Sequence, residues 1–71
     1  MLEQTIRVNG ENEALGEQRT LEGLLEEKTA DTSQRGIAVA LNGSVVPRAR
    51  WRETLLRAGD SIEIVRARQG G

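Results

Sequence analysis

The residues best suited to chemistry are the last six of the chain, Arg66 to Gly71, with the sequence Arg-Ala-Arg-Gln-Gly-Gly. Their most reactive group is the terminal carboxylate of Gly71. Because glycine has no side-chain bulk and reaches backbone conformations that other residues avoid, a Gly70-Gly71 end can lie against another protein's backbone and enter a narrow site. The opposing interpretation is that such an end is simply a place where disorder is tolerated. The residues before this end must distinguish between the two interpretations.

The composition argues against an active site built from the chain's own side chains. Cysteine and histidine are both absent from the 71 residues. Their absence removes a disulfide framework, thiolate metal ligands, a cysteine nucleophile and the usual general base. We therefore expect a protein that is not itself an enzyme, has no catalytic residues of its own and binds no metal.

The apolar residues and the charges limit the partners. No apolar run approaches the roughly 20 residues of a membrane span, and the start lacks the pattern of an export signal. We expect a cytoplasmic monomer that binds no membrane.

The charges are unevenly distributed along the chain. Residues 1–31 are net acidic and residues 32–71 net basic. Trp51 is the sole aromatic residue and the arginines are scattered, so we expect no nucleic-acid binding. Steering of the tail toward an acidic groove on a partner fits the same charges at least as well.

The first part of the chain predicts a hairpin followed by a helix. Apolar and polar residues alternate over residues 2–8, as in a half-buried strand. Asn9-Gly10 suits a two-residue turn, because both residues can take positive φ, and a short second strand is expected around residues 12–15. Thr20 is placed to cap a helix over residues 21–29. The apolar stripe of that helix consists of Leu21, Leu24 and Leu25.

The second part predicts three more strands. Residues 37–41 are the clearest strand, with Ile37, Val39 and Leu41 facing the helix and two alanines on the other side. Asn42-Gly43 predicts a second hairpin turn into a short strand at residues 45–46, which Pro47 ends. The stretch over residues 48–56 has no clean period. We expect Trp51 to close the core there beside Leu55 and Leu56. Residues 61–66 resume alternation as the last strand, with Ile62 and Ile64 facing inward.

This order of elements predicts an α+β fold in which a mixed sheet of four to five strands packs on one helix. For so short a chain, that is the β-grasp, or ubiquitin-like, arrangement. We expect residues 1–66 to form this domain and residues 67–71 to form a flexible tail.

Several short motifs occur in an order and spacing that are specific as a set. They are Val8-Asn9-Gly10, Leu21 to Leu25, Val39 to Gly43, Val46-Pro47-Arg48 followed by Trp51, Gly59-Asp60, and Gly70-Gly71. Through them the chain resembles, essentially end to end, the ThiS family of sulfur carriers in bacterial thiamine biosynthesis. The small subunit of molybdopterin synthase is a related carrier, but it usually has a pair of prolines before its diglycine, where this chain has residues 65–69, Val-Arg-Ala-Arg-Gln.

The resemblance implies a reaction at Gly71. A ThiF-type, ubiquitin-activating-like adenylyltransferase would use ATP and magnesium to convert the Gly71 carboxylate into an acyl-adenylate. A persulfide donor, such as a cysteine desulfurase, would then supply sulfur to form a thiocarboxylate, and a ThiG-type thiazole synthase would receive that sulfur. No cofactor would be bound permanently by the carrier.

The tail residues before Gly71 are expected to serve its insertion into the partner. These residues are Arg66, Ala67, Arg68, Gln69 and Gly70. Gly70 is expected to be needed for passage, whereas the two arginines either pair with acids lining the channel or remain solvated. The five residues from Ala67 to Gly71 would reach about 17 Å when extended.

The sheet face opposite the helix is a candidate docking surface. Ala38, Ala40 and Val65 are expected there, and small apolar side chains suit a flat contact with the activating enzyme and the synthase. Two alternatives remain open. One is a carrier for another pathway, such as molybdopterin synthesis, and the other is a ubiquitin-like binding module whose tail is inert.

Overall fold

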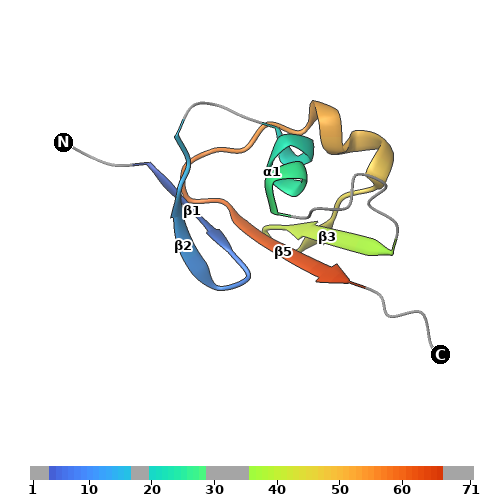
Figure 1. The fold of residues 1–71 in the computed structure, drawn as a ribbon, viewed down its shortest axis with the longest axis horizontal. Helices are drawn as coiled ribbons and strands as arrows, with labels where there is room; N and C mark the ends of the chain where they lie inside the picture. The colour runs from blue at the N-terminus through green and yellow to red at the C-terminus, as the bar shows by residue number, and fades with distance from the viewer. Residues whose placement is uncertain (1–3, 17–19, 29–35, 67–71) are drawn as a thin grey trace.

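The computed structural model describes residues 4–16, 20–28 and 36–66. In this part of the chain, five strands form one mixed sheet in the order β2-β1-β5-β3-β4. The strands are β1 (Thr5–Val8), β2 (Glu11–Ala14), β3 (Ile37–Leu41), β4 (Ser44–Val45) and β5 (Ser61–Arg66). The last strand therefore lies in the middle of the sheet (Figure 1). It runs parallel to β1 and antiparallel to β3.

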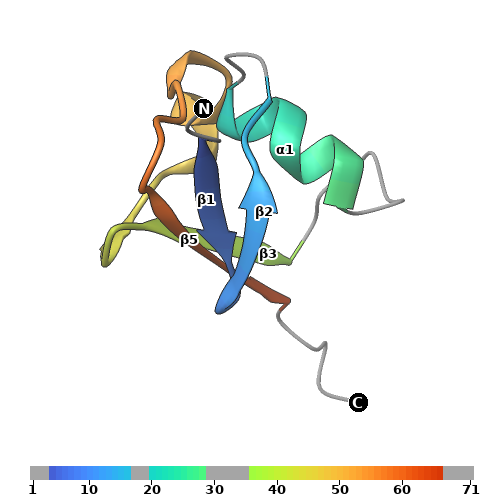
Figure 2. The ribbon, with the colours of Figure 1, turned by 90° about the vertical axis from the view of Figure 1, so that its left-hand side faces the viewer.

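Helix α1 (Leu21–Lys28) covers one face of this sheet (Figure 2). Thr20 begins it as predicted, because the Thr20 hydroxyl oxygen accepts a hydrogen bond from the backbone N–H of Gly23 at 3.1 Å. The three leucines of the predicted apolar stripe are completely buried. The helix thus supplies one half of the core, and the inner face of the sheet supplies the other.

The core is small and continuous. Val39 and Ile62, from the two neighbouring central strands, are almost completely buried, and Ile37, Leu41 and Ile64 pack against them at the edge of the core. These residues confirm the predicted alternation in β3 and β5. The buried core residues are Ile6, Val8, Leu15, Leu21, Leu24, Leu25, Val39, Trp51, Leu56 and Ile62.

A 3-10 helix, η1 (Arg48–Glu53), occupies the stretch in which the sequence shows no clean period. Trp51 is buried as predicted, and its indole N–H donates to the carbonyl oxygen of Val46 at 2.8 Å. Leu56 is buried in the same core, but the prediction for Leu55 is wrong because this residue is 51% exposed. The chain is extended after η1, so consecutive residues point to opposite sides and only one of the two leucines reaches the core.

Both Asn-Gly pairs form tight turns. Asn9 and Gly10 have φ values of 51° and 85°, and Asn42 and Gly43 have values of 52° and 88°. Positive φ at both central residues gives the turn a twist that matches the flanking strands. The strands differ from the prediction mainly at their ends, since β2 and β4 each begin one residue earlier than expected.

Candidate functional site

The predicted reactive end continues directly from β5. Arg66 is the last residue of that strand and is exposed. Residues Ala67, Arg68, Gln69, Gly70 and Gly71 lie outside the described residues, and their roles stay predictions. What the structure shows is how the strand that leads to them is held, with a neighbouring strand on each side.

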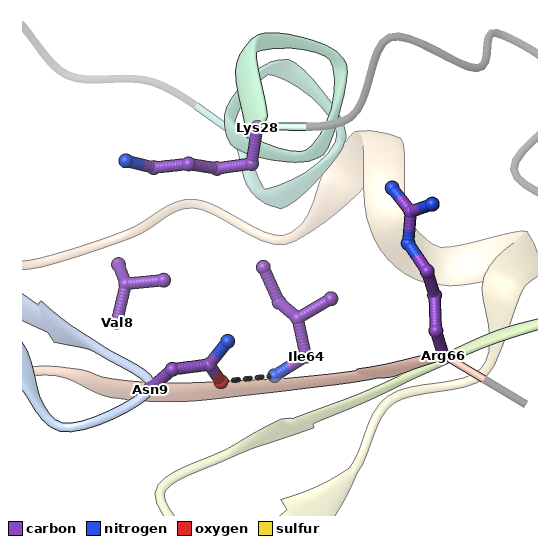
Figure 3. Close-up of a pocket in the computed structure, with 5 residues that line it drawn as sticks. All are labelled: Val8, Asn9, Lys28, Ile64 and Arg66. Carbon is purple, nitrogen blue, oxygen red and sulfur yellow. Dashed lines mark hydrogen bonds between the residues drawn. The ribbon is translucent and has the colours of Figure 1, made fainter.

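Asn9 secures β5 beyond the end of β1. Strands β1 and β5 pair only at Arg7 with Ser61 and at Val8 with Ile62. The backbone N–H of Asn9 then donates to the carbonyl oxygen of Ile62 at 2.9 Å. Its side-chain Oδ1 accepts from the backbone N–H of Ile64 at 2.8 Å (Figure 3). The Asn9 side chain therefore extends the hydrogen bonding along β5 by two residues, from Ile62 to Ile64, beyond the end of β1.

Asn42 secures the beginning of β5 in the same way. Its backbone N–H donates to the carbonyl oxygen of Ser61 at 2.7 Å. Its Oδ1 accepts from the N–H of Ser61 at 2.9 Å, and its Nδ2 donates to a carboxylate oxygen of Asp60 at 3.0 Å. The other oxygen of Asp60 accepts from the N–H of Arg57 at 2.8 Å. One asparagine from each hairpin turn thus bonds to a backbone N–H of the strand that leads to the tail.

Reasoning from the sequence missed this role of the asparagines. It used Asn9 and Asn42 as turn formers, for which glycine or aspartate would serve as well. A usable signal was that both turns contain asparagine, whose amide offers an acceptor and two donors on one short side chain.

The predicted docking residues lie together on the sheet face opposite α1. Ala38 is the cross-strand partner of Val65, and Ala40 is the partner of both Glu63 and Val45. Cross-strand partners share a face, so Val45 joins this group although the sequence did not indicate it. Val45 and Val65 are 74% and 59% exposed. We call Ala38, Ala40, Val45 and Val65 the outer patch. Glu63, the other partner of Ala40, lies on the same face beside it. The role of the patch in docking stays a prediction.

Among the described residues, no set of three or more acidic, cysteine or histidine residues is placed to hold a metal ion. Lys28 forms an ion pair with Glu13 of β2. No helix among the described residues has the length and apolarity needed to cross a membrane.

Comparison with known proteins gives one consistent result. The model of the ThiS family matches residues 3–71, a span that includes the Gly-Gly end. The sulfur carrier protein ThiS of Escherichia coli strain K12 is 36% identical over 53 residues, which cover 75% of this chain and 77% of that protein.

Solved structures agree with the sequence matches. The crystal structure of the thiamine biosynthesis protein ThiS from Geobacter metallireducens superposes with a TM-score of 0.77 and 28% identity, over 94% of this chain and 99% of that one. A solution structure of a thiamine biosynthesis protein from the same organism has a TM-score of 0.77 and 26% identity, over 94% and 87% of the two chains. The β-grasp fold expected from the order of elements is therefore confirmed.

Proposed function

Since the chain belongs to the ThiS family, we propose that it is a sulfur carrier of thiamine biosynthesis and that Gly71 is the residue that carries the sulfur. The observation behind the proposal is the family match over residues 3–71, which extends through Gly70-Gly71. The match to the Escherichia coli protein named as a sulfur carrier supports it further.

The first step is activation of the Gly71 carboxylate. An ionised carboxylate is a poor acyl electrophile, and its reference pKa of about 3.3–3.7 keeps it ionised at neutral pH. Attack of one carboxylate oxygen on the α-phosphorus of ATP forms the acyl-adenylate and releases pyrophosphate. A ThiF-type adenylyltransferase supplies the nucleotide site and magnesium for this step.

Sulfur then replaces one oxygen of Gly71. The terminal sulfur of a cysteine persulfide attacks the acyl carbon, and AMP leaves with the electrons of the broken C–O bond. A thiol then cleaves the S–S bond of the resulting acyl disulfide, which leaves a thiocarboxylate on Gly71 and a disulfide on the donor side. A ThiG-type thiazole synthase accepts the sulfur from this thiocarboxylate.

The carrier's own residues position the reacting end. The backbone bonds of β5 to β1 and β3, together with the side chains of Asn9 and Asn42, hold the strand in the sheet up to Arg66. A rigid base lowers the entropy lost when the tail is enclosed by a partner. The outer patch supplies the docking surface, since both partner enzymes must recognise the same carrier while they enclose its tail.

The test is intact-mass spectrometry of the protein after incubation with ATP, magnesium and the ThiF-type enzyme of the same organism, with and without sulfide. We expect the adenylate without sulfide and exchange of one oxygen for one sulfur with it. A chain lacking Gly70-Gly71 is the control and should fold without reacting. If the intact protein shows neither product while the enzyme activates its own known carrier, the proposal is wrong. Transfer to thiazole synthase, measured with the thiocarboxylate form, distinguishes this pathway from others.

A further inference from the structure

Lys28 is the only lysine among the 71 residues, and the other nine cationic side chains are arginines. A guanidinium cannot be deprotonated under ordinary conditions and has no free lone pair, so the arginines do not attack acyl groups. The neutral amine of a lysine does. Since cysteine and histidine are also absent, Lys28 is the strongest side-chain nucleophile of the chain.

Lys28 lies near the strand end from which the tail continues. It ends α1 and lines one hollow of about 270 Å³ together with Arg66, the last residue of β5 (Figure 3). The five residues after Arg66 can span up to about 17 Å. Residues that line a hollow of this size lie closer together than that span. An activated Gly71 that is free of its partner enzyme is therefore within reach of Lys28 in the same chain.

Glu13 holds the ammonium of Lys28 in another direction. Glu13 is the cross-strand partner of the buried Ile6, so its side chain lies on the sheet face that α1 covers. The Lys28 ammonium donates to the Glu13 carboxylate in an ion pair, and the two side chains are only 31% and 24% exposed. Figure 3 shows the Lys28 side chain pointing away from Arg66.

We propose that the ion pair with Glu13 keeps Lys28 from capturing the activated Gly71 end of its own chain. This inference rests on the proposed function, in which Gly71 becomes an acyl-adenylate. In the capture, Lys28 first loses a proton to water, and its nitrogen attacks the carbonyl carbon of Gly71. The bond from that carbon to the AMP oxygen breaks, AMP leaves with the electron pair, and the nitrogen loses a second proton to water. The product is an amide, which removes the chain permanently from sulfur transfer.

The ion pair matters because a tethered reaction has few other barriers. A short flexible tether places the two groups at an effective concentration in the millimolar range. Protonation and orientation of Lys28 then oppose the reaction. An ammonium has three donors and no lone pair to attack with, and the Glu13 carboxylate both favours this form and directs it toward β2. Ion pairs with this much exposure shift equilibria only a few-fold, so the protection is a matter of rate.

The test uses the full chain with a thioester installed chemically at Gly71, which stands in for the adenylate without the activating enzyme. The internal amide forms with loss of the thiol, so intact mass follows its rate and peptide mapping locates the bond. Glu13→Ala removes the carboxylate that holds Lys28, and Lys28→Arg keeps a cation but removes the nucleophile. Glu11→Ala is the matched control, because it removes the same charge from an exposed position of the same strand.

We expect the amide at Lys28 to form about two- to fivefold faster in Glu13→Ala than in the wild type. Glu11→Ala should match the wild type, and Lys28→Arg should form no internal amide. Equal rates in Glu13→Ala and the wild type, or an amide at any amine other than Lys28, would overturn the inference. Both outcomes leave the proposed function standing, since the adenylation assay tests it separately. Circular dichroism checks that each variant is folded.

Discussion

The side-chain oxygen of Asn9 lies 2.8 Å from the backbone nitrogen of Ile64, across 55 residues of sequence. Asn42 makes the equivalent bond to Ser61, 19 residues away. Together they bond the two hairpin turns to the strand that leads to the tail. Because the parallel pairing between β1 and β5 is only two residues long, the bond from Asn9 extends the attachment toward Arg66.

Replacing Asn9 by glycine should destabilise the domain. Glycine keeps the positive φ of the turn but removes the acceptor for Ile64, and it adds freedom to the unfolded chain. We expect the free energy of unfolding to fall by about 1–2 kcal/mol in a urea titration. Asn9→Asp, which keeps an acceptor oxygen, should lose less. Equal losses for the two variants would show that the bond to Ile64 contributes nothing.

Trp51 should be the most sensitive single position of the core. Trp51→Phe keeps an aromatic ring but leaves the carbonyl oxygen of Val46 without its indole donor, so we expect a loss of about 1–2 kcal/mol. Trp51→Ala should cost about 3–5 kcal/mol, which is comparable to the whole stability expected for a domain of this size. Thermal unfolding followed by circular dichroism should therefore show a lowered transition for the first variant and little or no transition for the second. Similar transitions in both would contradict the role of the ring.

Gly23→Ala should stabilise the protein. Gly23 lies within α1, and a Cβ there would meet only the hydroxyl oxygen of Thr20, at 3.5 Å, an ordinary contact. Since alanine is favoured over glycine in a helix by up to about 1 kcal/mol, the urea midpoint should rise. A lowered midpoint would mean that the cap from Thr20 to the N–H of residue 23 is disturbed.

Ala40→Asp should weaken binding to both the activating enzyme and the synthase. Ala40 is half-buried at the centre of the outer patch, and a charge there would have to be desolvated in the complex. We expect at least about a tenfold loss of affinity. Ala49→Asp is the matched control, because Ala49 is exposed in η1 and outside the patch. Equal affinities for the two variants would remove the outer patch as a docking surface.

Gly70→Ala should impair sulfur loading without changing stability. The added Cβ would meet the walls of a channel that fits a bare backbone, whereas within residues 4–16, 20–28 and 36–66 the last side chain packed against the core is that of Ile64. We expect a rise in the carrier KM, a fall in kcat, or both, in the adenylation assay with an unchanged urea midpoint. Gln69→Ala is the control because it adds no bulk. An unaffected Gly70→Ala variant would indicate a wide channel.

The sequence predicted the elements of the fold better than their contacts. The stripe of Leu21, Leu24 and Leu25 and the alternation in β3 and β5 were sufficient, because burial imposes a period on the residues themselves. The orientation of Leu55 and Leu56 could not be predicted, since two adjacent apolar residues in an extended segment fit the core equally well until the direction of the chain is known. The outward position of Val45 likewise depends on its register with Ala40.

The site was predicted only in part for a similar reason. The types and order of the tail residues could be interpreted directly, because their proposed chemistry depends on a free backbone end. The bond between Asn9 and Ile64 could not be predicted, since the two residues come from separate segments that the sheet order brings together. Nothing in their spacing along the chain marks them as neighbours.

The central position of β5 also has a consequence for the synthesis of the protein. The hairpins β1-β2 and β3-β4 have no strand pairing with each other in this sheet, so β5 alone connects them. A ribosome makes β5 last of the five strands, and the sheet cannot close before that strand has emerged. We expect chains arrested before Ser61 to show no protected amides in β3 by hydrogen exchange. Completion of the fold would then follow the synthesis of Ser61–Arg66, so that prematurely terminated chains remain unfolded and open to proteolysis.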